Sequence, residues 1–268
     1  MNSRTYLTIG ILVIVLALLI GLLVSRMPAS TPPAGTPDIT VSTTTVESAT
    51  SSPTAAAGQG MVAPHTTTVN PVPVSPTDHT ASWSFTGSYT GANAVKKQAE
   101  IATLTSELGT GKYADSDIYT GIGQDYELLG DGQNAYLNYV KAAEADTSLG
   151  LALNDIGELM ERLGAVNTAR AAYQAAVAKE PTVEVYQLAY LSFLRAHDPS
   201  SAATAAAFAS AKVALNASPN FLVMEANWYA SIGNKTAAIA DWELVRPKVG
   251  ASQQASIDAT IAALKGGQ

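Results

Sequence analysis

The chain has 268 residues, of which 47% are hydrophobic and 14% charged, and its formal net charge is -7. This acidic balance argues against a nucleic-acid-binding protein, which would need a basic surface. The absence of cysteine excludes disulfides, thiolate metal sites, a cysteine nucleophile and a cysteine-linked lipid anchor.

The first distinctive segment is an uncharged apolar run at residues 6–24, which follows a short tail at residues 1–5. At about 1.5 Å per residue, a helix of this length crosses the roughly 30 Å hydrocarbon core of a bilayer. A cleaved signal peptide is the alternative, but its apolar region is only about 7–15 residues long. No pair of small residues follows at the cleavage spacing. The run therefore predicts a transmembrane anchor that contacts the lipid bilayer.

The charges that flank this run indicate its orientation. Arg4 and the α-amine precede it, Arg26 follows it, and the next basic residue is Lys96. Positive charges close to a membrane span favour the cytoplasmic side. We therefore expect a cytoplasmic N-terminus and an extracytoplasmic C-terminal domain, in the periplasm or at the cell surface.

Residues 27–80 are dense in Ser, Thr, Pro, Ala and Gly and contain few large apolar residues. Such a segment buries too little apolar surface to offset the cost of ordering its backbone, about 1–2 kcal/mol per residue. The composition predicts a disordered linker, of the kind that also carries O-glycans. The helical domain is expected at residues 81–268.

Three aromatic residues near the start of this domain stand at even intervals, at Trp83, Phe85 and Tyr89. Alternation of this kind favours a short strand. The other interpretation is an apolar strap that packs on the amphipathic helix expected at residues 93–108.

An internal repeat follows. When the segment that begins at Asp117 is set against the segment that begins at Leu151, the two align without a gap. The aligned identities are Ile122 with Ile156, Gly123 with Gly157, Leu129 with Leu163, Gly130 with Gly164, Ala135 with Ala169, Tyr139 with Tyr173, and Ala142 with Ala176.

Each repeat unit has the pattern of a helical hairpin, because its apolar residues recur at spacings of three and four. Gly130 and Gly164 are expected to end the first helix in the left-handed conformation. Asp131 or Asn167 then caps the second helix, and Pro181 ends it. The repeated alanines allow the paired helices to approach closely, and the repeated tyrosines fill the wider gap.

These features resemble the tetratricopeptide repeat, whose period of about 34 residues equals the spacing of the two segments. Gly123 and Gly157 match the small residue of its first helix, and Pro181 matches its closing proline. The departures are Tyr119 or Leu153 in place of the family's tryptophan, and Thr147 in place of the first closing proline. The resemblance implies an all-α solenoid of hairpins in a right-handed superhelix. Its units are expected at about 116–149, 150–183, 182–218 and 219–248, with a capping helix at 252–265.

Catalytic patterns are missing from the sequence. It contains no paired-histidine zinc motif, nucleophile elbow or phosphate-binding loop. The aspartates between residues 115 and 131 lack the ligand spacing of a calcium loop. We therefore expect no enzymatic activity, no cofactor and no metal.

The resemblance instead implies a binding groove lined by the first helices of the hairpins. Ordinary solvation of the acidic residues, and core packing of the aromatic ones, are the alternatives. The groove positions carried over are Thr120, Gln124 and Glu127 in the first unit, Asn154, Glu158 and Glu161 in the second, and Tyr186, Tyr190 and Phe193 in the third.

Charge indicates the kind of partner. Residues 107–161 contain eleven acidic residues and only two lysines, so the expected partner is a basic and partly apolar protein or peptide segment. Three functions remain open. They are a membrane-tethered scaffold for envelope or secretion proteins, a periplasmic chaperone-like binder of unfolded or translocating chains, and a passive structural or surface-display protein.

Overall fold

The computed structural model describes residues 70–78 and 82–266. They belong to one compact unit, Ala63–Gln268. Within these described residues, no helix combines the length and apolarity needed to cross a membrane. The anchor predicted at residues 6–24, and the linker residues before residue 70, lie outside them.

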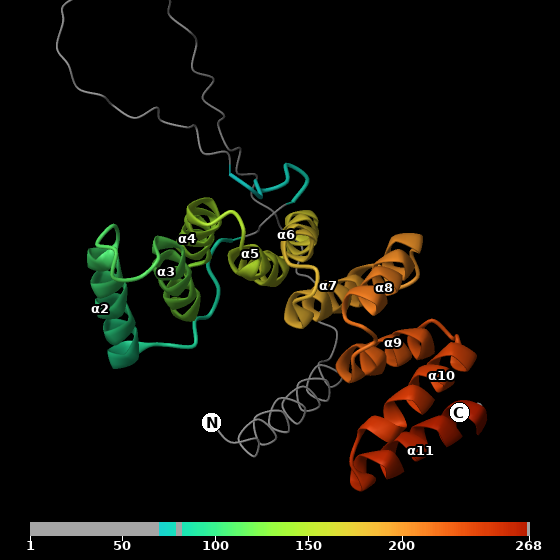
Figure 1. Cartoon of the computed structure of the whole chain (residues 1–268). Coiled ribbons are helices and arrows are strands. Elements are labelled where there is room, and N and C mark those ends of the chain that lie inside the picture. Colours follow the sequence, from blue (N-terminus) through green and yellow to red (C-terminus); the bar gives the residue numbers. More distant parts are fainter. Residues whose placement is uncertain (1–69, 79–81, 267–268) are drawn as a thin grey trace, which may run out of the picture. The chain divides into compact units, whose positions relative to one another are not determined.

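The regular structure of the described residues is helical, which confirms the predicted all-α fold (Figure 1). The helices are α2 (Gly91–Glu107), α3 (Asp115–Leu129), α4 (Gly132–Ala145), α5 (Leu151–Arg162), α6 (Val166–Lys179), α7 (Glu184–His197), α8 (Ala202–Ala214), α9 (Pro219–Ser231), α10 (Lys235–Val245) and α11 (Ala251–Gly266), with a short 3-10 helix at Arg246–Lys248.

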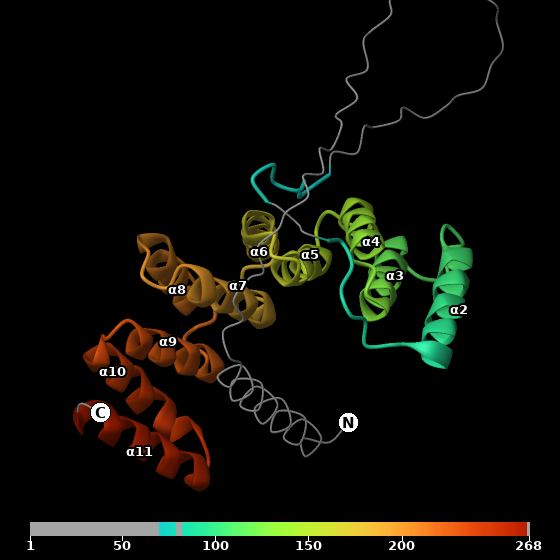
Figure 2. The same cartoon turned by 180° about the vertical axis from the view of Figure 1, so that it is seen from behind.

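The helices pack as consecutive antiparallel hairpins, α3 with α4, α5 with α6, α7 with α8 and α9 with α10. Each hairpin contacts the next, mainly through α4 with α5 and α6 with α7. Helix α2 lies against α3, and α11 lies against α10 (Figures 1 and 2). The first helices of the first three hairpins, α3, α5 and α7, carry the predicted groove residues, and we call their shared surface the first-helix face.

Close helix contact explains the repeated glycines and tyrosines. A Cβ atom on Gly123 would lie 2.5 Å from Cε1 of Tyr139, and one on Gly157 would lie 2.7 Å from Cδ1 of Tyr173. Each tyrosine ring therefore lies directly on the backbone of the facing helix. The repeated alanines are buried at the same interfaces, at Ala135, Ala142, Ala169 and Ala176.

The turns inside the first two hairpins use a left-handed glycine, as the sequence predicts. Gly130 has φ 82° and Gly164 has φ 79°, a region that residues with a Cβ avoid. Asp131 caps α4 by accepting a hydrogen bond from the Asn134 amide at 3.0 Å. The equivalent prediction for Asn167 is wrong, because α6 begins after Ala165 and receives no cap from its own hairpin.

The cap of α6 comes from a distant part of the chain. Residues 70–78, which we call the strap, end in Asp78, whose carboxylate accepts hydrogen bonds from the Asn167 amide at 3.0 Å and the Thr168 amide at 2.6 Å. The Thr168 hydroxyl donates a third bond at 2.6 Å. These bonds lower the pKa of Asp78 against the opposing effect of burial. A carboxylate is favourable at a helix N-terminus, where unpaired N–H groups and the helix dipole meet.

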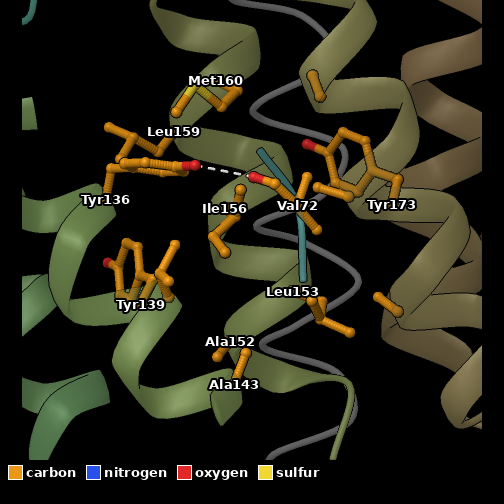
Figure 3. Packing of buried hydrophobic residues seen from close by; sticks show 14 of the residues in the cluster. Val72, Tyr136, Tyr139, Ala143, Ala152, Leu153, Ile156, Leu159, Met160 and Tyr173 are labelled. Carbon is orange, nitrogen blue, oxygen red and sulfur yellow. Dashed lines mark hydrogen bonds between the residues drawn. The ribbon is translucent and has the colours of Figure 1, made fainter. Parts of the chain in front are cut away.

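The other end of the strap packs beside α4 and α5, so the disorder predicted for residues 27–80 is wrong for residues 70–78. Val72 is 2% exposed, and its carbonyl accepts a hydrogen bond from the Tyr136 hydroxyl at 2.8 Å (Figure 3). Asn70 donates to the same hydroxyl at 2.8 Å. Two apolar side chains, Val72 and Val74, and a few specific hydrogen bonds therefore order a segment whose average composition predicts disorder.

Of the aromatic residues that follow, Trp83 and Phe85 dock on the turn between α3 and α4, and Tyr89 lies beside Lys97 of α2. The Phe85 amide donates to the Gly130 carbonyl at 3.1 Å, and the Gly132 amide donates to the Trp83 carbonyl at 2.7 Å. Trp83 also packs on the Tyr136 ring, at 5.5 Å between centroids. The pairing of Ser84 with Asp131 is an isolated bridge, so the segment that contains Trp83 and Phe85 is an irregular connection and not a strand.

We expect Val72→Asp to lower the free energy of unfolding by about 2–4 kcal/mol, because it places a charge in an apolar contact. Thermal denaturation followed by circular dichroism measures the effect. Pro71→Ser is the matched control, since Pro71 is exposed in the same strap, and it should change stability little. Equal stability of the Val72 variant and the wild type would show that the strap is not part of the fold.

Candidate functional site

The predicted groove residues divide into exposed and buried sets. Gln124 and Glu158 are exposed on the first-helix face, and Glu127 and Glu161 are partly exposed. All four lie on α3 or α5. These residues form the accessible part of the predicted groove.

The predicted aromatic stripe is not an open surface. Tyr186 and Tyr190 are each 8% exposed and Phe193 is 1% exposed, and all three belong to the core shared with α4, α5 and α6. The Phe193 ring packs on Tyr173 at 5.4 Å between centroids. Core packing, the alternative interpretation, therefore describes this face of α7. Thr120 and Asn154 are buried as well.

The repeat places the same polar pair in two consecutive hairpins. The Tyr139 hydroxyl donates to Oε2 of Glu127 at 2.9 Å, and the Tyr173 hydroxyl donates to Oε2 of Glu161 at 3.0 Å. Burial and these nearby carboxylates raise the pKa of both tyrosines, so the hydroxyls remain protonated donors. Glu127 and Glu161 thus help to position the core tyrosines in addition to lining the first-helix face.

Each of these two glutamates also contacts a basic side chain. Oε1 of Glu127 lies 2.7 Å from Nη1 of Arg162, and Oε1 of Glu161 lies 3.1 Å from Nε2 of His197. Because these pairs are partly exposed, each contributes little to stability. Arg162 nevertheless offsets part of the negative charge of Glu127.

The centre of the face is a carboxylate that sequence reasoning does not single out, Asp155 on α5. Burial raises its pKa to about 7, Glu158 and Glu127 add repulsion, and the Gln124 side chain opposes the shift. Its Oδ2 atom is buried without a hydrogen-bond partner. We call Glu127, Asp155 and Glu158 the acidic cluster. No signal in the sequence distinguishes it, because Asn154 and Glu158 are polar residues in the same stretch, 151–160.

Perturbed carboxylates of this kind mark candidate functional sites, although structural networks produce them too. Among the described ranges, no group of three or more His, Asp or Glu side chains has the arrangement of a metal site. The acidic cluster can attract a cation or a positively charged side chain, and it offers acceptors but no nucleophile held by a base. The expectation that the protein is not an enzyme stays a prediction.

We expect Asp155→Asn to raise the free energy of unfolding by about 1–3 kcal/mol at pH 8, because it removes a poorly solvated charge. The folded-state pKa, about 7, is higher than the ordinary value of 3.8. The wild-type protein therefore has the full stability that protonated Asp155 allows below about pH 4, and it loses this stability as pH rises through 7. Chemical denaturation at pH 5 and pH 8 measures this difference, and the gain should be smaller at pH 5. A destabilised variant at pH 8 would contradict the assigned environment.

No protein-family model matches the chain, and no curated protein matches it. Among solved structures, ten chains match. One of these is the crystal structure of MamA, which has 15% sequence identity and a TM-score of 0.45, over 60% of this chain and 95% of that chain. These similarities assign the chain to no family.

Proposed function

We propose that the protein is a non-enzymatic scaffold that binds a basic protein segment on its first-helix face. It would be anchored in a membrane by residues 6–24 and would present a right-handed array of tetratricopeptide-like hairpins outside the cytoplasm, to recruit envelope or secretion-related proteins. The acidic cluster is the observation that carries this proposal. Glu158 is exposed and forms no ion pair within the described ranges, so its negative charge is available to a partner.

Apolar contacts for such a partner come from the starts of the first helices and not from the aromatic stripe. Leu149 and Leu151 at the start of α5, and Val185 at the start of α7, are exposed. Leu151 and Val185 are separated by one repeat period, so they occupy equivalent positions in adjacent hairpins. A basic segment with a few aliphatic residues fits this combination of charge and exposed apolar surface.

A chaperone-like binder of unfolded chains is the second candidate from the sequence. It would need a broad apolar surface to hold many different segments. The burial of Tyr186, Tyr190 and Phe193 removes most of the surface on which that alternative depended. A passive structural or display role has no specific observation in its favour.

Chemical crosslinking in intact membranes, followed by recovery of the full chain, tests the proposed scaffold. We expect Gln124→Lys combined with Glu158→Lys to weaken capture of the natural partner at least fivefold. Both positions are exposed, and the two introduced lysines would repel a basic segment. Added salt should weaken capture in the same direction.

The choice of residues follows from the hydrogen bonds described above. Reversing Glu127 or Glu161 would also disturb the tyrosines that they hold. Glu158 instead accepts a hydrogen bond from the Asn154 side chain on its own helix, so the chosen pair should change the melting temperature less. Lys235→Glu, at an exposed position on α10, is the control. Undiminished capture by the double variant would show that the first-helix face is not the binding surface, and recovery of many unrelated chains would favour the chaperone-like function.

A further inference from the structure

A cavity of about 480 Å³ lies between α2 and the end of α3. This volume falls in the range of small-molecule pockets, about 300–1,000 Å³. Four parts of the fold contribute to it, and its lining residues differ from those of the predicted groove. The lining includes Tyr89 in the connection before α2, Gln98 and Ile101 on α2, Tyr126 and Leu129 on α3, and Asp131, the N-cap residue of α4.

Backbone and core contacts hold the walls of the cavity. The Tyr89 amide donates a hydrogen bond to the Leu128 carbonyl at 3.1 Å, which fixes the connection on the end of α3. Ile101 is 9% exposed and belongs to the apolar cluster on which Tyr126 packs. Tyr89 and Gln98 are exposed, so a ligand can reach the cavity from solvent.

The charge around the cavity favours a cation. Both oxygens of Asp131 accept hydrogen bonds from Asn134, at 3.0 and 2.7 Å, which leaves about half of the acceptor sites of the carboxylate open. Helix α3 ends at Leu129, and the C-terminus of a helix carries partial negative charge. Tyr89 and Tyr126 add aromatic rings, whose faces attract cations.

One cation already lies beside the cavity. Nζ of Lys97 is 5.7 Å from the centroid of the Tyr89 ring, so this ring accepts a positive group. The lysine charge is offset by Asp125 at 2.8 Å and by Glu100 at 2.6 Å. Within the described ranges, Asp131 has no basic partner. Its negative charge is therefore available to a ligand.

The adjacent turn shows how this chain holds a guanidinium group. Cζ of Arg162 lies 5.1 Å from the centroid of the Phe85 ring, and its Nη1 lies 2.7 Å from Oε1 of Glu127. A guanidinium group is planar and weakly hydrated, so it can stack on a ring while its N–H groups pair with a carboxylate. The cavity brings together the same two elements, aromatic rings and a carboxylate.

We infer that this cavity binds one guanidinium group, which pairs with Asp131, donates to the Gln98 side-chain oxygen and stacks on a tyrosine ring. The group can belong to an arginine of a protein partner or to a free alkylguanidine. The inference goes beyond the proposed function, because the site requires neither the acidic cluster nor the exposed residues of the first-helix face.

Nuclear magnetic resonance titration of the detergent-solubilised full chain tests the inference. The probes are agmatine and the capped peptide Ala-Ala-Arg-Ala-Ala, with matched peptides that carry citrulline or lysine at the centre. We expect the amide signals of Tyr89, Gln98 and Leu129 to shift with agmatine or the arginine peptide. Citrulline has nearly the same shape without the charge, so its peptide should bind at least tenfold more weakly. The lysine peptide should bind at least threefold more weakly, because an ammonium group cannot stack.

Two lysine variants test the position of the site. Gln98→Lys places a positive charge at the cavity and should weaken binding of the arginine peptide at least tenfold. Ala99→Lys is the matched control, since it adds the same charge at the next exposed position of α2, and it should change binding less than twofold. The double variant Gln124→Lys and Glu158→Lys should bind agmatine as the wild type does.

Two further positions test the contacts. Tyr89→Leu should weaken binding at least threefold, while Tyr89→Phe keeps the ring and should retain binding. Asp131→Asn should weaken binding at least fivefold with little change in melting temperature, because asparagine also caps a helix.

The two sources of the guanidinium group give different results. Binding of agmatine as tightly as the arginine peptide would support a free alkylguanidine, and much tighter binding of the peptide would support a protein partner. Lack of binding by both probes, equal binding of the citrulline or lysine peptide, or full binding by Asp131→Asn would overturn the inference. Equal effects of Gln98→Lys and Ala99→Lys, or loss of agmatine binding in the double variant, would also overturn it.

Discussion

Gly123→Ala is expected to lower the free energy of unfolding by about 2–4 kcal/mol, although alanine is the better helix former. The new Cβ would lie 2.5 Å from Cε1 and 2.6 Å from Cδ1 of Tyr139, distances that van der Waals radii forbid. The ring cannot turn away easily, because its hydroxyl is held by Glu127 at 2.9 Å. Helices α3 and α4 must therefore separate, and overpacking of this kind is typically costly by about 1–3 kcal/mol or more.

Gly121→Ala is the matched control, two residues earlier in the same helix. A Cβ at Gly121 would meet only Cδ1 of Leu104 at 3.4 Å, which is an ordinary contact. We expect this variant to gain about 0.5–1 kcal/mol from helix propensity. Guanidinium denaturation measures both variants, and equal stability of the two would contradict the contact between Gly123 and the tyrosine ring.

The hairpins were predictable because their determinants are local and repeated. Gly130 and Gly164 adopt left-handed conformations, and no other residue type adopts these as readily. Gly123 faces Tyr139 across the hairpin, and the same contact recurs in the next hairpin between Gly157 and Tyr173. A pattern that appears twice in one register reports a structural requirement of the unit, so the sequence alone was sufficient to identify it.

The strap was not predictable, because its contacts are long-range and occur only once. Asp78 caps α6 through residues about ninety positions later in the chain, and no periodicity connects the two segments. Val72 was one aliphatic residue among many small and polar ones. The average composition of a segment does not reveal which of its side chains is buried in the core.

The aromatic stripe on α7 shows a different limit of sequence reasoning. Tyr186, Tyr190 and Phe193 do share one face of the helix, as their spacing predicts. Spacing identifies which residues face the same way, but not whether a neighbouring hairpin or a ligand covers them. The same limit applies to Asp155, whose pKa depends on burial and on Glu127 from another helix.

The ion cluster of α8, α9 and α10 was likewise invisible in the sequence, because it joins one residue from each of three helices. Glu225 and Asp241 are buried, and Nζ of Lys212 lies between them. Burial and the neighbouring Asp241 raise the pKa of Glu225, while Lys212 opposes the shift. A cluster with two carboxylates and one ammonium group tolerates the loss of its cation poorly.

Lys212→Met is therefore expected to lower the free energy of unfolding by about 2–4 kcal/mol at pH 8, since it leaves two buried carboxylates without a counter-charge. The lysine is 39% exposed, so solvent moderates the loss. The pKa of Glu225 is already raised, and removal of the lysine raises it further. The stability of the variant therefore falls as pH rises through the pKa of Glu225. Calorimetric unfolding should therefore show a smaller loss of stability at pH 5 than at pH 8.

Lys235→Met, at an exposed position on α10, is the control and should change stability by less than about 0.5 kcal/mol. Adding Glu225→Gln and Asp241→Asn to the Lys212 variant should recover most of the loss, and a deficit that stays equal at both pH values would show that the buried charges do not cause it.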